Sequence, residues 1–190
     1  MINFIKKENG GFTLIETLVA ISIFTTSVLT LVIMLSQGIS DTNYAKNKII
    51  AGYLSQEGIE YVRNLRDTYV VSGATAQAGW NAFVNKLSNG GCMLSAGCFF
   101  DDIAIFEDSS ITFSAFSACG TPCQVLNYNF GVGSLGKYFY AIGQSSGFRR
   151  VINVTVVGVD EVKVSSTVYW GQASGTKNVV LSENLFNWSE

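Results

Sequence analysis

The sequence predicts an α+β protein in which a long N-terminal α-helix packs on a C-terminal antiparallel β-sheet domain. A long apolar run fills residues 12–35. Apolar residues then recur at three- and four-residue spacings to about residue 67, and from about residue 111 the spacing becomes two. This change of period indicates one long helix that is followed by a sheet.

The apolar run predicts a membrane span. Residues 12–35 read FTLIETLVAISIFTTSVLTLVIML, and a helix that rises about 1.5 Å per residue crosses a hydrocarbon core roughly 30 Å thick over this length. Lys6 and Lys7 precede the run, and no Lys or Arg follows it before Lys46. We therefore expect a cytoplasmic N-terminus and an exported C-terminal part. The run is too long for a secretory signal peptide and has no small-residue cleavage site after it.

Glu16 is the one charged side chain within this run. A carboxylate deep in a membrane span costs roughly 2.5–3.5 kcal/mol on insertion scales. Near the end of a plain anchor it could instead reach the membrane interface. We interpret Glu16 as a functional residue whose cost is offset by a partner of opposite charge.

The helix continues beyond the run as an amphipathic segment over residues 36–68. Its apolar positions share one helical face and are Ile50, Tyr53, Leu54, Tyr61, Val62 and Leu65. We expect this face to pack on the C-terminal domain.

Residues 69–110 are predicted to be a loop region, because they are rich in Ser, Gly, Ala and Asn. A short helical pattern runs from Trp80 to Leu87 within it, and we expect Trp80 to be a core residue.

Residues 111–190 are predicted to form the antiparallel sheet domain. The strongest signal is a hairpin that turns near Gly158, where residues 148–156 and 162–170 alternate between apolar and polar side chains. Weaker strand candidates bring the expected sheet to about four to six strands, and they lie at residues 111–116, 125–130, 137–142 and 178–182.

The four cysteines lie at 92, 98, 119 and 123. In an exported domain an even number of cysteines predicts disulfides, whereas in a cytosolic protein it would suggest a metal site. Three pairings are open. We favour Cys92–Cys98 and Cys119–Cys123, because each pair brackets a turn that contains glycine.

Composition disfavours several other functions. The chain has no His, which removes the commonest general base and metal ligand. A net charge of −2 gives no basic surface for nucleic acid, and no phosphate-binding loop of the ATPase type is present. We predict no enzyme, no cofactor and no metal site.

Two clusters of charged residues receive ordinary interpretations. The acidic residues between positions 101 and 108 lack the spacing of a calcium loop, so we interpret them as a solvated loop. Arg149 and Arg150 are neighbours in a predicted strand and should point to opposite faces, which makes them a poor joint binding patch. We interpret them as a solvated strand end.

The string Gly10-Gly11-Phe12-Thr13-Leu14-Ile15-Glu16, after a short leader with lysines and at the start of an apolar helix, resembles the cleavage and methylation signature of type IV prepilins and pseudopilins. The resemblance implies that residues 1–11 are a leader, that a membrane peptidase cuts after Gly11, and that the new amine on Phe12 is methylated. It also implies that the Glu16 carboxylate pairs with the Phe12 amine of the same or a neighbouring subunit.

The C-terminal pattern gives a looser resemblance. Phe148-Arg149-Arg150-Val151-Ile152, the valine-rich strands, Trp170 and the closing Asn184-Leu185-Phe186-Asn187-Trp188 resemble minor pilins grouped with the pilus modification protein PilV.

Together these resemblances imply a structural subunit of a type IV pilus or pilus-like filament, with a minor pilin favoured. The implied partners are other pilin subunits, the prepilin peptidase and methylase, and the pilus assembly platform with its ATPase. The subunit would wait in the cytoplasmic membrane and then join an extracellular or periplasmic filament. The alternatives are a pseudopilin of type II secretion, a minor pilin at the filament tip for adhesion or DNA uptake, and an uncleaved membrane-anchored enzyme.

Overall fold

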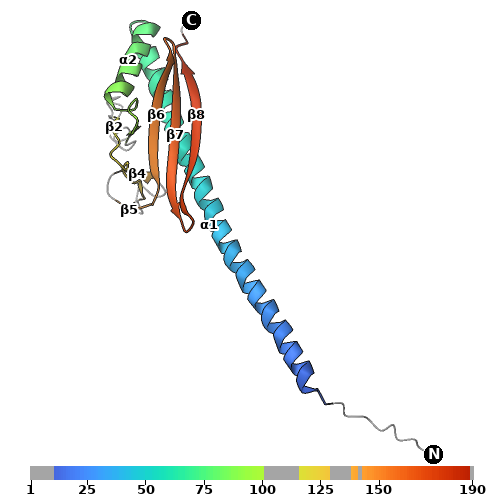
Figure 1. The fold of residues 1–190 in the computed structure, drawn as a ribbon. Helices are drawn as coiled ribbons and strands as arrows, with labels where there is room; N and C mark the ends of the chain where they lie inside the picture. Colours follow the sequence, from blue (N-terminus) through green and yellow to red (C-terminus); the bar gives the residue numbers. More distant parts are fainter. Residues whose placement is uncertain (1–10, 101–115, 129–137, 141–142, 189–190) are drawn as a thin grey trace, which may run out of the picture. The chain divides into compact units, whose positions relative to one another are not determined.

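The computed structural model describes residues 11–100, 116–128, 138–140 and 143–188. The chain divides into two compact units, Met1–Ala45 and Lys46–Glu190. The longest element, α1 (Leu14–Ser72), begins in the first unit and ends in the second (Figure 1). Residues 1–10, the acidic residues between positions 101 and 108 and most of the strand candidate at 111–116 lie outside the described residues.

In the first unit, α1 is a continuous helix whose side chains are exposed along its whole length. Its N-cap is Thr13, whose hydroxyl accepts a hydrogen bond from the Glu16 backbone N–H at 3.4 Å. By length and composition α1 contains a segment apolar enough to cross a membrane, and none of that segment is buried by protein. The predicted span is therefore a regular helix with no protein core of its own.

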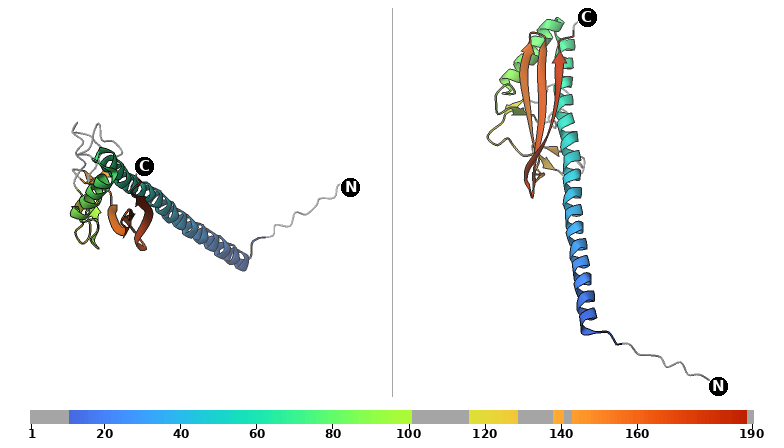
Figure 2. Two further views of the ribbon diagram at one scale, coloured as in Figure 1. Left: turned by 90° about the horizontal axis from the view of Figure 1, so that it is seen from above. Right: turned by 45° about the vertical axis from the view of Figure 1, so that its right-hand side comes forward.

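The second unit is built on a five-stranded antiparallel sheet in the order β2-β1-β6-β7-β8. Its three long strands are β6 (Arg149–Gly158), β7 (Glu161–Gln172) and β8 (Gly175–Phe186). Two short strands, β1 (Cys98–Phe99) and β2 (Ser117–Ala118), extend the sheet beyond β6. The part of α1 that belongs to this unit runs along one face of the long strands (Figures 1 and 2).

A smaller three-stranded sheet lies beside the main one in the order β4-β3-β5. Its strands are β3 (Asn127–Tyr128), β4 (Tyr138–Phe139) and β5 (Gln144–Ser145). Leu126 ties it to the start of β6, because its N–H donates to the Phe148 carbonyl at 2.8 Å.

The predicted hairpin is confirmed. β6 and β7 pair antiparallel with Val154 opposite Val164 and Arg149 opposite Tyr169. Val162, Val164, Val168 and Trp170 are buried on one face of β7, as the alternation predicts. β8 is longer than the predicted strand at 178–182, because it pairs with β7 over its entire length.

Two apolar clusters form the core of the second unit. The larger one joins α1, α2 (Ala76–Asn89) and the sheet, and it includes Val62, Leu65, Trp80 and Ile152. The smaller one joins α1 to β7 and the small sheet, and it includes Leu54, Leu126, Phe148 and Trp170. The amphipathic face expected for residues 36–68 is thus the face that packs on the sheet, although Tyr53 on α1 is exposed.

The short helical pattern around Trp80 is α2. The Thr75 hydroxyl caps its N-terminus by accepting a hydrogen bond from the Ala78 N–H at 3.1 Å. Trp80 is buried, as expected, and its indole N–H donates to the Val159 carbonyl at 2.9 Å.

Two expectations were wrong in detail. α1 ends at Ser72 rather than near residue 67, because Val70 continues its buried face for another turn. Arg150 is not part of a solvated strand end. Its side chain is fully buried and its Nη1 lies 2.7 Å from the Glu57 carboxylate on α1, while Arg149 is exposed.

Candidate functional site

The peptide bond between Gly11 and Phe12 lies before the start of α1. Both residues are exposed and neither is helical. A Cβ placed on Gly11 would meet no atom within 4 Å, so nothing in the described chain covers this bond. The bond is therefore accessible from solvent in the described part of the chain.

The polar side chains of the apolar segment are almost all satisfied within the helix itself. Every hydroxyl between residues 14 and 35 donates a hydrogen bond to a backbone carbonyl three or four residues earlier, and these residues are Thr17, Ser22, Thr25, Thr26, Ser27 and Thr30. Such bonds lower the free energy cost of placing a hydroxyl in hydrocarbon. The segment can therefore lie in an apolar environment despite its six hydroxyl groups.

Glu16 differs from these hydroxyl residues. It occupies the first turn of α1, where its backbone N–H is held by Thr13. In a full capping box the glutamate side chain would return a hydrogen bond to the N-cap backbone. Within the described part of the chain, the Glu16 carboxylate makes neither this bond nor an ion pair. Among residues 14–35 it is thus the polar side chain that has no partner within the described part of the chain.

The N-terminal segment also matches a known family. Residues 6–33 match the family described as the prokaryotic N-terminal methylation motif. This is the prepilin-type cleavage and methylation motif. It indicates a precursor of the type IV pilin-like or pseudopilin kind, and it suggests a structural subunit rather than an enzyme. The apolar N-terminal helix fits a membrane-anchored precursor.

A prepilin-type motif implies processing by prepilin peptidase and assembly with other pilins. The match covers Gly11, Phe12 and Glu16 as well as Lys6 and Lys7, although the two lysines lie outside the described residues. No curated protein and no solved structure matches this chain at a significant level.

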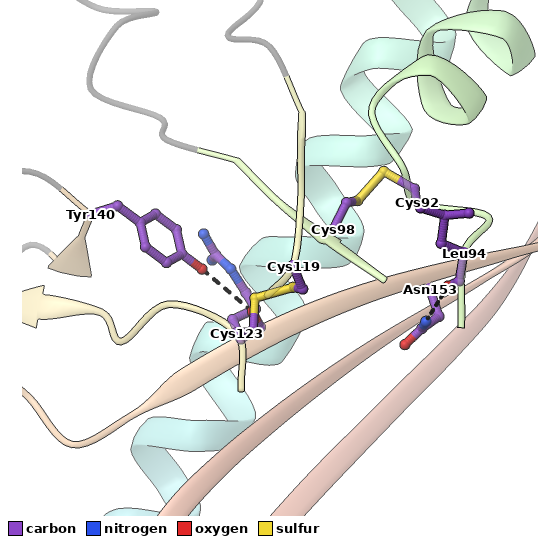
Figure 3. Close-up of a disulfide and its surroundings, with 8 residues drawn as sticks. Cys92, Leu94, Cys98, Cys119, Cys123, Tyr140 and Asn153 are labelled. Atoms are coloured by element: carbon purple, nitrogen blue, oxygen red, sulfur yellow. Dashed lines mark hydrogen bonds between the residues drawn. A yellow bond between two sulfur atoms is a disulfide. The ribbon is translucent and has the colours of Figure 1, made fainter. Parts of the chain in front are cut away.

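The second candidate region contains the two disulfides, which are Cys92–Cys98 and Cys119–Cys123. This is the local pairing that we favoured from the sequence. Cys92 follows α2 and Cys98 begins β1, so the first bridge closes the turn that connects the helix to this strand (Figure 3). The second bridge closes the loop that contains Pro122. Among the described residues, no three His, Cys, Asp or Glu side chains gather closely enough to hold a metal ion.

The sequence did not lead us to expect the ion pair between α1 and β6, in which the Arg150 side chain is buried. Arg150 pairs with Glu57, its Nη1 also donates to the Leu54 carbonyl at 3.3 Å, and its guanidinium lies 4.3 Å from the centre of the Phe100 ring. Arg150 lies on the inward side of β6 with Ile152 and Val154. The alternation along this strand could therefore have predicted that the Arg150 side chain is buried.

Proposed function

We propose that this chain is a structural subunit of a type IV pilus or pilus-like filament, which is cut after Gly11 and assembled through its N-terminal helix. The observation that carries the proposal is the contrast within residues 14–35. Their hydroxyls are satisfied inside the helix, while the Glu16 carboxylate has no partner among the described residues. A plain anchor has no use for such a group.

Cleavage would supply the missing partner. Cutting after Gly11 leaves a cationic amine on Phe12, four residues before Glu16. Burying a lone charge is expensive, but a paired amine and carboxylate compensate each other. The pair forms within one subunit or between the Phe12 of one subunit and the Glu16 of its neighbour, and the second arrangement would set the register between subunits.

Filament formation exchanges lipid contacts for helix contacts. Because lipid tails are as apolar as leucine, the gain in free energy comes from packing and polar pairing rather than from leaving water. A single charge pair can therefore decide whether the subunit assembles. Lys6 and Lys7 would hold the leader in the cytoplasm, with the sheet domain on the outer side of the membrane.

Glu16→Ala tests the assembly role. We expect the variant to be processed normally and to enter the membrane, because the change makes the span more apolar. Its filament yield should fall severalfold or more, as measured by shearing and immunoblotting. The matched control is Thr17→Ala, which removes a hydroxyl that is already satisfied by Leu14. Normal assembly of Glu16→Ala would contradict the charge pairing.

Gly11→Trp tests the processing site. We expect a full-length precursor that stays in the membrane, because a bulky side chain before the cut bond should block the peptidase. The intact mass of the membrane-extracted protein shows whether residues 1–11 remain. Loss of the leader in this variant would place the cut elsewhere.

Within this class we assign the chain to the minor pilins, on the C-terminal pattern described above. Immunogold labelling of filaments distinguishes the assignments. Sparse labelling or labelling at the tip supports a minor subunit. Dense labelling along the shaft supports a major subunit. A pseudopilin of type II secretion is the alternative, and neighbouring secretin and secretion genes would favour it.

A further inference from the structure

A cavity of about 280 Å³ opens on the face of the sheet that is turned away from α1. Its floor is formed by Val151 on β6 and Tyr169 on β7, and these residues alternate with the inward-facing Ile152 and Val168. Its volume is close to the roughly 300 Å³ at which small-molecule pockets begin. None of the residues that bear on filament assembly in the proposal above takes part in it.

The strand register brings three polar side chains to this cavity. Arg149 lies directly opposite Tyr169, and Thr176 on β8 lies opposite Gly171, two residues further along β7. Side chains directly opposite each other on neighbouring strands are separated by about 4.5–5.5 Å at Cβ. The guanidinium and the phenol ring are therefore held side by side by backbone pairing, rather than by a mobile loop.

The remaining wall is the loop closed by the Cys119–Cys123 disulfide. Thr121 and Pro122 line the cavity from this loop. Because a covalent bridge ties the two ends of the loop together, the wall is fixed before any ligand arrives. Such preorganisation lowers the entropic cost of binding.

Arg149 is the unusual residue of the site. The chain contains four arginines, and three of them, Arg63, Arg66 and Arg150, form ion pairs with carboxylates. Arg149 forms no ion pair with any residue that the structure describes, and among these residues no carboxylate lines the cavity. The cavity therefore carries a single positive charge with an open planar fork of donors.

We propose that this cavity binds a carboxylate that is carried on a six-membered ring. Arg149 would hold the carboxylate through paired N–H donors. The Tyr169 ring, which is 37% exposed, would lie against the face of the ligand ring, and Val151 and Pro122 would contact its apolar edge. The Thr121 and Thr176 hydroxyls would bond polar groups at the rim. Arg149 is the one charged side chain among the described residues that line the cavity, and a single cation favours a singly charged ligand over a phosphate dianion.

The chemistry could come from an acidic sugar or from an aromatic acid, so the test uses one probe of each. Full-length protein in detergent micelles is titrated with glucuronate, benzoate and glucose, and binding is followed by saturation-transfer NMR. We expect saturable binding of at least one acid and none of glucose. Binding of glucuronate assigns the site to acidic sugars, and binding of benzoate alone assigns it to aromatic acids.

Variants decide whether the binding occurs in this cavity. Arg149→Gln should weaken acid binding at least tenfold, and Tyr169→Ala should also weaken it, while Tyr169→Phe should retain it. The matched control is Lys163→Gln, which removes an exposed cation from the same face of β7 outside the cavity. Thermal unfolding confirms that each variant is folded.

Three results would overturn the proposal. The first is that neither acid binds, and the second is that glucose binds as well as the acids. The third is that Lys163→Gln weakens binding as much as Arg149→Gln, which would indicate general attraction of anions. We expect processing and filament yield to be unchanged in Arg149→Gln. Failure of the binding proposal would therefore leave the filament proposal intact, and failure of the filament proposal would leave the binding proposal intact.

Discussion

The two parts of α1 on either side of Ala45 have the same backbone and opposite surroundings. In the first part the apolar side chains are exposed, with Leu29 at 62%, whereas in the second part Leu65 is 0% exposed and packs against the sheet. The second part thus obtains its apolar environment from its own chain. The first part has to obtain it from a membrane or from other subunits, which is what a filament subunit requires.

The largest expected effect is on the free energy of unfolding, and it distinguishes the two parts of α1. Leu65→Ala should lower the free energy of unfolding of the second unit by about 2–5 kcal/mol, because it leaves a cavity in the main core. Leu29→Ala is the matched control and should leave this free energy unchanged. Urea unfolding in micelles measures both, with the fluorescence of the buried Trp80 and Trp170 as the signal. Equal effects would mean that Leu29 also has a core within its own chain.

The buried ion pair should give the next largest effect. Glu57→Ala removes the carboxylate partner of Arg150, whose side chain is 1% exposed, and we expect a loss of about 3 kcal/mol. This is the lower end of the range for buried pairs, because the Glu57 side chain is 41% exposed. Combining Glu57→Ala with Arg150→Met should recover most of the stability, since no buried charge remains. A double variant as unstable as the single one would show that Arg150 itself is required.

The sequence could predict the parts of the molecule that repeat a local pattern. The period of 3.6 marked α1, the period of two marked the β6–β7 hairpin, and the spacing of Cys92 and Cys98 suggested their pairing. The strands β1 to β5 are two residues each, which is too short to display any period. Their positions depend on contacts with distant parts of the chain.

The features that the sequence could not predict depend on contacts between residues that are far apart in the chain. Arg149 and Arg150 are chemically identical neighbours, yet one lies at an open cavity and the other pairs with a glutamate 93 residues away. Alternation indicates that they separate, but it does not indicate which partner each one meets. The cavity beside Arg149 needs three strands and a disulfide loop together. Glu16 is easier to single out as a candidate from the sequence, because a charge in an apolar run is visible without any partner.

Two glycines in the second part of α1 should give smaller changes in stability, and the two changes should have opposite signs. A Cβ on Gly58 would lie 2.5 Å from Ser166 Oγ and 2.8 Å from Ile152 Cδ1, so Gly58→Ala should cost about 1–3 kcal/mol through overpacking. A Cβ on Gly52 would meet nothing within 4 Å. Gly52→Ala should therefore stabilise the unit by about 0.5–1 kcal/mol through helix propensity. Urea midpoints that shift in the same direction would show that the helix and sheet are not in contact at Gly58.

The smallest effect concerns the surface link between α1 and β8. Arg63 bonds Glu60 and Glu183, and the hydrogen bond to Glu183 raises the pKa of Arg63 above its usual value. The stabilisation is therefore complete below that usual value and is lost only at strongly alkaline pH. Both side chains of the Arg63–Glu183 pair are about one third exposed, at 35% and 33%, so Glu183→Gln should cost less than about 1 kcal/mol.

The difference in stability between Glu183→Gln and the unmodified protein should shrink as salt is added, because salt screens exposed pairs. Lys163→Gln removes a charge that has no ion pair within the described chain, and it should show no such dependence on salt. A loss for Glu183→Gln that does not change with salt would indicate that the pair acts through packing rather than charge.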